Sequence, residues 1–251
     1  MISPRSGEVA GIVSGERAVT ASQPWTAALG SLVGETGEVQ FVCGGSLLSS
    51  SSILTSAHCL ARLDSLGEET KVLLGQTDLA REEAGAQVRG VRASLLHPGW
   101  SGSPHHDLAI LQLDRAVRLT DSVRPICLPT SESDSQDRHS QVGVISGWGR
   151  NYSGGPASSH LQTGQVEILP QSDCPHLLPH ILPHLPHLLP HLPRQDLLCA
   201  RGLPTARSEL TTDACQVRSL GGGEWPGVML SYRETAGDLS PRKTTSLDCG
   251  D

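Results

Sequence analysis

The sequence predicts an all-β protein, and three observations carry that prediction. Between residue 12 and about residue 169, short apolar segments alternate with stretches rich in Gly, Ser, Pro and Asp, a spacing typical of a sandwich or barrel rather than of alternating strands and helices. No long stretch shows a convincing helical period. Aromatic residues make up only 3% of the chain, so the core must be built mostly from Leu, Val, Ile and Ala.

Seven apolar segments are the expected strands. Each is short and is bounded by turn-forming residues. They lie at residues 39–42, 53–56, 72–74, 88–96, 108–113, 142–145 and 166–169. A chain of 251 residues suits one large domain or two small lobes.

Composition narrows the class of protein. The net charge of −7 argues against a nucleic-acid binder, and no run of eighteen apolar residues exists to span a membrane. The seven cysteines are dispersed and form no Cys-x-x-Cys pair, which favours disulfides in an oxidising compartment. We therefore expect an extracellular, secreted protein, although the first residues lack the apolar core of a signal peptide.

Residues 175–193 interrupt the strand pattern. Proline recurs every third or fourth residue there, which forbids a continuous helix and removes strand hydrogen bonds. The five histidines of this tract could in principle collect zinc or copper; they are His176, His180, His184, His187 and His191. An expanded repeat in a tolerant surface loop is the simpler interpretation, so we expect no metal site and no cofactor.

Two motifs carry a family resemblance. Residues 54–59 read Leu-Thr-Ser-Ala-His-Cys and follow Cys-Gly-Gly-Ser-Leu at 43–47, while residues 107–111 read Asp-Leu-Ala-Ile-Leu. His58 precedes Asp107 by about fifty residues, which is the chymotrypsin-type order. Together these motifs resemble the trypsin-like serine proteases.

Further motifs extend the resemblance over residues 12–216. They are Ile-Val-Ser-Gly at 12–15 with Pro-Trp at 24–25, Arg-Pro-Ile-Cys-Leu-Pro at 124–129, Ser-Gly-Trp-Gly at 146–149, Leu-Cys-Ala at 198–200 and Thr-Asp-Ala-Cys-Gln at 212–216. The resemblance implies two antiparallel six-stranded β-barrels, at about 12–125 and 126–216, with a catalytic cleft between them. Residues 1–11 would then be the remnant of a propeptide or linker.

The resemblance also implies roles for single residues. His58 would be general base and acid, and Asp107 would hold its imidazole and stabilise the imidazolium as it forms. Asp213 would lie at the base of the specificity pocket and pair with a substrate Arg or Lys. The expected partners are therefore protein or peptide substrates cleaved after Arg or Lys, together with serine protease inhibitors. Gly11 precedes Ile12 where zymogen activation of this family needs Arg or Lys.

The nucleophile segment departs from the family pattern. Family members continue Cys-Gln with Gly-Asp-Ser-Gly-Gly-Pro, whereas this chain continues with Val217, Arg218 and Ser219. Ser219 stands at the nucleophile's offset, but Val217 replaces a glycine that donates to the oxyanion, and Arg218 reverses the charge of the expected Asp. Losing one oxyanion donor costs about a hundred- to a thousandfold in rate. We expect little or no peptidase activity.

Residues 217–251 have no strand pattern, and the second barrel would lack its last strands. We expect an unrelated, disordered tail. Two alternatives to an active protease follow: an inactive protease-like binding module, or a non-functional product of intron retention. The second fits the codons CAG-GTG-AGG for Gln-Val-Arg at 216–218, because GTGAGG is a good splice-donor sequence.

Disulfides and one glycosylation site complete the expectations. A Cys43–Cys59 bridge would close a short loop and hold His58 at a strand end, which stabilises by about 3 kcal/mol in the chain-entropy model. The resemblance implies a second bridge, Cys174–Cys199. Cys127 resembles a tether to an upstream light chain; Cys127, Cys215 and Cys249 either lack partners or two of them pair together. Asn151 begins a glycosylation sequon.

Overall fold

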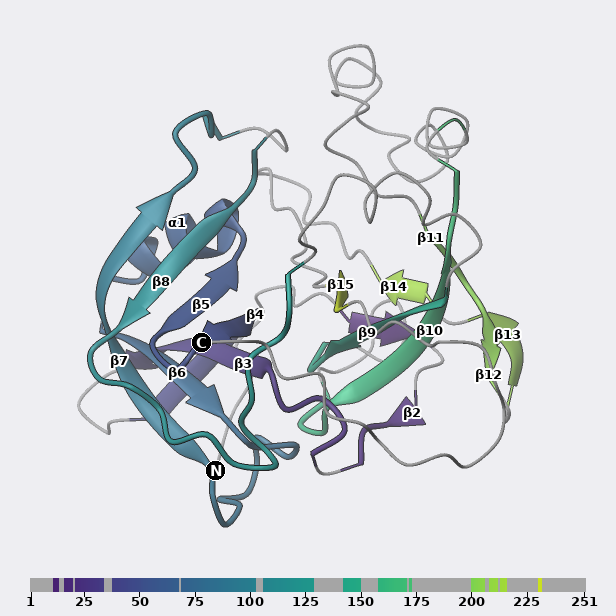
Figure 1. Cartoon of the computed structure of the whole chain (residues 1–251), viewed down its shortest axis with the longest axis horizontal. Helices are drawn as coiled ribbons and strands as arrows, with labels where there is room; N and C mark the ends of the chain where they lie inside the picture. Colours follow the sequence, from purple (N-terminus) through teal and green to yellow (C-terminus); the bar gives the residue numbers. More distant parts are fainter. Residues whose placement is uncertain are drawn as a thin grey trace.

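The computed structural model describes most of the first half of the chain and parts of the second. The described residues are 11–13, 16–19, 21–33, 38–67, 69–102, 106–128, 142–149, 158–170, 172, 200–205, 208–211, 213–215 and 230–231. Figure 1 shows two groups of strands side by side, one from the purple-to-teal half of the chain and one mainly from the green half. Within the described residues, no helix is long and apolar enough to cross a membrane.

The first group is a closed antiparallel barrel (Figure 1). Its strands follow the order β3-β4-β5-β8-β7-β6. Their bounds are β3 (Thr26–Val33), β4 (Glu38–Ser49), β5 (Ser52–Thr55), β6 (Thr70–Leu74), β7 (Gln87–Leu96) and β8 (Ala109–Leu113). Closure leaves no free strand edge, and it confirms the barrel predicted for the first half.

Alternating apolar side chains build the core of this barrel. In β5, Ile53 is buried while its neighbour Leu54 is partly exposed, and β8 alternates in the same way. Gly45 permits close approach, since a Cβ there would lie 2.6 Å from Cγ2 of Ile53. The buried cluster comprises Ala27, Leu29, Val42, Leu47, Ile53, Leu60, Leu63, Val72, Leu74, Ala109, Leu111, Leu113, Val117 and Val123.

The strand predictions can be compared directly with this barrel. The five segments expected between residues 39 and 113 all fall largely within β4 to β8. The sequence did not indicate β3, whose Thr-Ala-Ala-Leu-Gly-Ser-Leu-Val is poor in β-branched residues and pairs with both β4 and β6. It also did not indicate helix α1 (Ala57–Ser65), which buries Leu60 and Leu63 in the barrel core.

The second group is an open sheet within the described residues. Its order is β11-β10-β9-β15, and β2 also pairs with β10. The bounds are β2 (Glu16–Arg17), β9 (Val142–Gly147), β10 (Gln162–Ile168), β11 (Ala200–Gly202) and β15 (Leu230–Ser231). Its buried cluster consists of Ile145 and Val166 with Ala200 packed against them. The expectation of an incomplete second barrel is thus confirmed.

Three short pairings complete the described structure. β1 (Gly11–Val13) pairs with β14 (Asp213–Cys215), and β12 (Pro204–Thr205) pairs with β13 (Ser208–Thr211). β15 is a difference from expectation, because residues 230–231 belong to the tail for which no strand was expected. It pairs antiparallel with β9, Leu230 opposite Ile145, and so adds to the edge of the second sheet.

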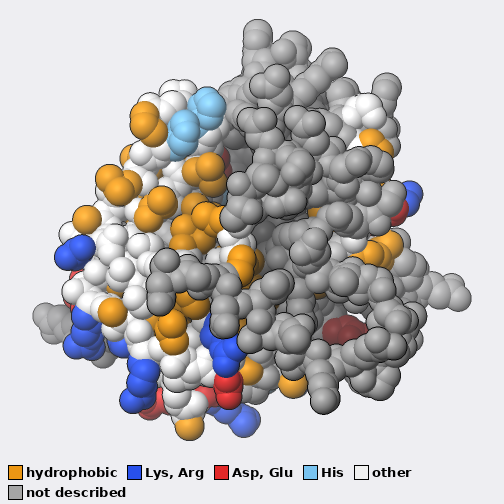
Figure 2. Space-filling model, viewed as in Figure 1, with side chains coloured by type: hydrophobic (Ala, Val, Ile, Leu, Met, Phe, Trp, Pro, Cys, Tyr) orange, Lys and Arg blue, Asp and Glu red, His pale blue; other side chains and the backbone are white. Residues whose placement is uncertain are grey.

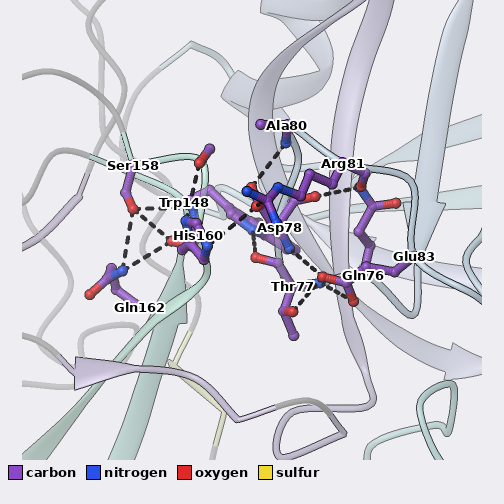
Figure 3. Close-up of polar contacts among 11 residues, drawn as sticks. Gln76, Thr77, Asp78, Ala80, Arg81, Glu83, Trp148, Ser158, His160 and Gln162 are labelled. Carbon is purple, nitrogen blue, oxygen red and sulfur yellow. Dashed lines mark hydrogen bonds and ion pairs between the residues drawn. The ribbon is translucent and has the colours of Figure 1, made fainter.

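The two groups are joined by main-chain hydrogen bonds. Polar contacts around Asp78 and His160 accompany them, and Figure 3 shows these contacts. Asp78 and His160 form an isolated antiparallel bridge, and around it the Leu79 amide donates to the Ser159 carbonyl at 2.8 Å. The Leu161 amide donates to the Thr77 carbonyl at 2.7 Å. These bonds connect the β6–β7 loop of the first barrel to the segment that precedes β10.

A buried carboxylate lies at the centre of this inter-barrel contact. Asp78 is 6% exposed, and its Oδ2 lies 3.3 Å from Nε2 of His160 and 3.7 Å from Nε of Arg81. Burial raises the pKa of Asp78, but the Ala80 amide, the Ser159 hydroxyl and the charges of His160 and Arg81 together hold it below its ordinary value. These groups therefore favour the ionised form of Asp78 in this contact.

The outer face of β7 and β8 carries exposed apolar side chains. Leu95 and Ile110 lie opposite each other in register and are 65% and 37% exposed. Leu96 and Leu108 are exposed beside them. Figure 2 shows hydrophobic side chains gathered over this face of the first barrel.

Candidate active site

His58 lies in the first turn of α1, directly after β5. Ser56 is the N-cap residue, and the hydroxyl of Thr55 donates to the Gly44 carbonyl at 2.9 Å, which ties the end of β5 to β4. Cys59 is bonded to Cys43 with a Cα–Cα distance of 5.9 Å. The predicted Cys43–Cys59 bridge is confirmed, and it anchors the helix turn that carries the histidine.

Asp107 enters from the connection between β7 and β8. His106 has a positive φ of 54°, and its imidazole stacks on that of His97 with ring centroids 4.6 Å apart. The His97 amide donates to the Leu108 carbonyl at 2.9 Å, which closes the base of this connection. Gly99 lets the chain approach His106 closely, because a Cβ there would lie 2.6 Å from Cδ2 of the His106 ring. These contacts orient the backbone on which Asp107 stands.

The histidine and the aspartate meet through two hydrogen bonds. Nδ1 of His58 lies 2.6 Å from Oδ2 of Asp107, and the His58 amide donates to Oδ1 at 2.8 Å. The two side chains are 17% and 20% exposed. A carboxylate at Nδ1 holds the proton on that nitrogen, so Nε2 is left as the proton acceptor. This tautomer is the one that a general base needs.

The environment keeps Asp107 ionised. Burial raises the pKa of Asp107, but the hydrogen bonds from the His58 ring, the His58 amide and the Ala57 amide, together with the His58 charge, hold it below its ordinary value. A carboxylate that stays ionised can stabilise an imidazolium formed during proton transfer.

A serine hydroxyl lies on the other side of the imidazole. Oγ of Ser56 is 3.3 Å from Nε2 of His58, and this hydroxyl makes no hydrogen bond to the helix that it precedes. Sγ of Cys59 lies 3.6 Å from the same nitrogen. Ser56 belongs to the motif that predicted the site, but no role was assigned to it, because its contact depends on the orientation of the His58 ring.

The described structure brings together only part of the predicted site. His58 and Asp107 meet, and Asp213 lies in β14, opposite Val13 of β1. Ser219, the Cys174–Cys199 pair and Asn151 lie outside the described residues, as do the histidines of 175–193. Cys127 is disulfide-bonded in this single chain, which favours a partner within the chain over the expected tether to a light chain.

One group of side chains has the composition of a metal site but cannot act as one. Donor atoms of Cys43, His58 and Cys59 lie within 4.8 Å of one another. The two sulfurs are joined in a disulfide, so neither offers the thiolate that a metal needs. No other such group occurs among the described side chains.

A histidine bonded through Nδ1 to a partly buried carboxylate, directly after a strand of a closed six-stranded barrel, has the geometry of the histidine–aspartate pair of serine peptidases. Comparison with known families agrees with this class. The Trypsin family model matches residues 12–207, and the chain belongs to the trypsin family.

Individual relatives support the same assignment. The chain is 34% identical to the venom serine protease Bi-VSP of Bombus ignitus, covering 65% of this chain and 46% of the relative. It is 31% identical to coagulation factor IX of Cavia porcellus, with coverage of 67% and 57%, and 32% identical to chymotrypsin-C of Bos taurus, with coverage of 65% and 59%. The chain thus spans about half the length of these relatives.

A solved structure supports the fold alone. The structure described as "Structure of GrC" superposes with a TM-score of 0.54 at 24% identity, over 65% of this chain and 68% of that chain. The fold is therefore the all-β fold of the trypsin family, with the first barrel closed and the described second sheet open.

Proposed function

We propose that this chain is a trypsin-type serine-peptidase domain that retains its acid–base pair but has little or no peptidase activity. The observation that carries the proposal is the 2.6 Å contact between His58 and Asp107. In an active domain, Nε2 of His58 removes the proton of a serine hydroxyl as that oxygen attacks the substrate carbonyl, and then gives the proton to the leaving amine. Asp107 stays ionised throughout and stabilises the imidazolium.

The expected weakness lies at the nucleophile. Ser219 is the candidate oxygen, but the amide of a stiff, β-branched Val217 would have to replace a glycine amide at the oxyanion. Arg218 carries the wrong charge to pair with a freed amino terminus. Any residual activity would favour bonds after Arg or Lys, through an ion pair with Asp213 at the base of the pocket.

Labelling with a fluorophosphonate probe tests this proposal directly. The purified full chain is incubated with the probe and digested, and the modified residue is located by mass spectrometry. We expect no adduct at Ser219 and no hydrolysis of an Arg-amide substrate. An adduct on Ser219 that disappears in His58→Ala would show a working nucleophile and would overturn the proposal.

Ser56 needs its own control, because its hydroxyl already contacts Nε2 of His58. The Ser56→Ala and Ser219→Ala variants are therefore labelled in parallel with the unmodified chain. An adduct that is lost only in Ser56→Ala would show that the probe reacts with Ser56 and not with Ser219. Such reactivity would also contradict the proposed inactivity.

A second candidate function is that of an inactive, protease-like binding module. The assembled His58–Asp107 pair favours it, because a surface for substrates or serine protease inhibitors can persist where turnover is lost. Binding to an immobilised peptide inhibitor that presents Arg to the specificity pocket tests both candidate functions. A product without function should not bind this inhibitor.

Sequencing of transcripts across the Gln216 codon tests the intron-retention hypothesis. A spliced transcript that encodes Gly-Asp-Ser-Gly-Gly-Pro after this codon would support it.

We also infer secretion into an oxidising compartment. The Cys43–Cys59 disulfide and the relatives of this family support this location. Glycosylation of Asn151 would accompany it. Expression in a eukaryotic cell with the family's own type of secretion signal, followed by glycosidase treatment, should give a mobility shift that Asn151→Gln abolishes. An unshifted secreted chain would contradict the assignment of Asn151.

A further inference from the structure

An open hollow lies at one end of the first barrel, away from the His58–Asp107 pair. Its volume is about 630 Å³, and it is lined by residues 86–89 and 115–118. Residues 86–89 include the start of β7, and residues 115–118 follow the end of β8. Asp107 lies before the start of β8, so the hollow and the catalytic pair are at opposite ends of the same two antiparallel strands.

Three arginines surround this hollow in a chain of net charge −7. Arg115 and Arg118 are exposed, and neither forms an ion pair with another described side chain. Burial lowers the pKa of Arg89, the charge of Arg115 lowers it further, and Asp114 only partly opposes this. Figure 2 shows Lys and Arg side chains, with some Asp and Glu side chains among them, along the lower left edge of the first barrel. Positive charge is therefore concentrated here without full compensation.

The guanidinium of Arg89 is fixed by neutral acceptors. Its Nη2 donates to Oε1 of Gln87 at 2.8 Å, and its Nη1 donates to the Val88 carbonyl at 2.8 Å. Gln87 is 8% exposed, and its amide also joins the Arg118 main chain, with bonds of 2.7 and 2.9 Å. A buried side chain thus holds both edges of the hollow together. The positive charge of Arg89 stays available, with its planar group already oriented.

We propose that this hollow binds the sulfate groups of a sulfated polysaccharide. Arginine forks suit tetrahedral oxyanions, since two parallel N–H groups match two oxygens and the guanidinium is weakly hydrated. The walls offer alanine, valine and guanidinium groups, with no aromatic anchor for a peptide. The Cys43–Cys59 disulfide indicates an oxidising compartment, where sulfated glycans rather than nucleic acids are the abundant polyanions. Binding at this site requires no turnover.

Titration with a heparin-derived octasaccharide tests the site. The full chain is compared with Arg115→Gln/Arg118→Gln and with the matched control Arg17→Gln/Arg92→Gln, which removes two exposed arginines outside the hollow. Each lost guanidinium should weaken binding about fivefold, and about twenty-fivefold for the pair. In Arg115→Gln/Arg118→Gln, the slope of log affinity against log salt concentration should also become shallower by about two, because two fewer ion pairs form. The control variant should keep most of the affinity of the unmodified chain.

The possible outcomes test two statements separately: that the ligand binds in the hollow, and that the ligand is a sulfated polysaccharide. Equal losses in the two double variants would mean that overall charge, not the hollow, binds the octasaccharide, and would overturn the site. Absence of binding by the unmodified chain would do the same. Hyaluronan of equal length carries carboxylates but no sulfates and should bind at least about tenfold more weakly. An oligoglutamate peptide that bound as tightly as the octasaccharide would overturn the ligand class.

Discussion

The first barrel and the second sheet differ in the size of their buried cores. The barrel closes on itself and holds fourteen buried residues in one cluster, whereas the described part of the second sheet holds two, Ile145 and Val166. An open sheet has unpaired edges and few buried contacts per strand. The stability of the described structure should therefore reside mainly in the first barrel.

The two halves also divide the predicted site residues. The His58–Asp107 pair lies entirely on the closed barrel, where the Cys43–Cys59 bridge and the β7–β8 connection orient it. The expected nucleophile and specificity residue belong to the other half of the chain. The contacts described for the His58–Asp107 pair come from the first barrel and its connections, and such a pair alone does not establish catalysis.

The largest expected effect comes from removing matched core side chains. Ile53→Ala in the closed barrel should lower the free energy of unfolding by about 3–5 kcal/mol, because a dense core collapses little around a cavity. Ile145→Ala in the second sheet should cost roughly half as much, since fewer buried neighbours are lost. Denaturant unfolding measures both. Equal losses would break the contrast between the halves.

The disulfide should have the next largest effect. Cys43→Ala/Cys59→Ala removes a crosslink across a 16-residue separation and should cost about 3 kcal/mol, given a loop of that size in the unfolded chain. The melting temperature by differential scanning calorimetry measures the loss. Because Cys127 is also disulfide-bonded, the control is to map the disulfides of the variant by mass spectrometry under non-reducing conditions. The pairing of Cys127 should be unchanged.

The inter-barrel contact predicts a smaller, pH-dependent effect. Asp78→Asn removes a buried carboxylate that accepts hydrogen bonds and faces His160, and should cost about 1–3 kcal/mol near neutral pH. Asp121→Asn, which breaks only an exposed pair with Arg124, should cost less than about 1 kcal/mol.

The sign of the pH dependence follows from the lowered pKa of Asp78. Its contribution is complete above the ordinary value of 3.8 and is lost as pH falls through the lower value of the folded state. Unfolding free energies of the unmodified chain should therefore decline below about pH 4, and Asp78→Asn should flatten that decline. Parallel acid curves for the two proteins would contradict this role for Asp78.

The smallest expected effect concerns the exposed apolar face of β7 and β8. Leu95→Ser/Ile110→Thr should change the free energy of unfolding by only about 1 kcal/mol, because Leu95 is mostly exposed and Ile110 is partly exposed. It should reduce binding of a hydrophobic dye and slow association of the chain. Light scattering over time measures the association, with Ser94→Thr on the same strand as the control.

The spacing of apolar segments predicted a sandwich or barrel, and local motifs made the His58–Asp107 contact predictable. His58 lies beside a cysteine in a short motif and Asp107 begins an apolar strand, and the resemblance of these motifs to the trypsin-like proteases implied that the two side chains meet. The Cys43–Cys59 bridge could also be predicted, because both cysteines belong to these motifs. Strand β3 was not, because Ala, Gly and Ser give no alternating apolar pattern even though the strand lies between two partners in the barrel.

Long-range contacts had no signal in the sequence. Asp78 and His160 are far apart in the chain and belong to no shared motif, yet they lie at the junction of the two halves. The contact between Ser56 and Nε2 of His58 depends on a ring orientation that residue order does not encode. The hollow of Arg89, Arg115 and Arg118 likewise exists only because β7 and β8 are neighbours in the barrel.

Amide hydrogen exchange tests the contrast between the halves most directly. Amides of β5 and β8, including those of Ile53 and Leu111, should exchange together as the slowest group of the chain. Amides of β9 and β10, including those of Ile145 and Val166, should exchange at least about tenfold faster through local opening. Uniform protection across both groups would contradict the claim that the first barrel, which holds the His58–Asp107 pair, is the stable unit.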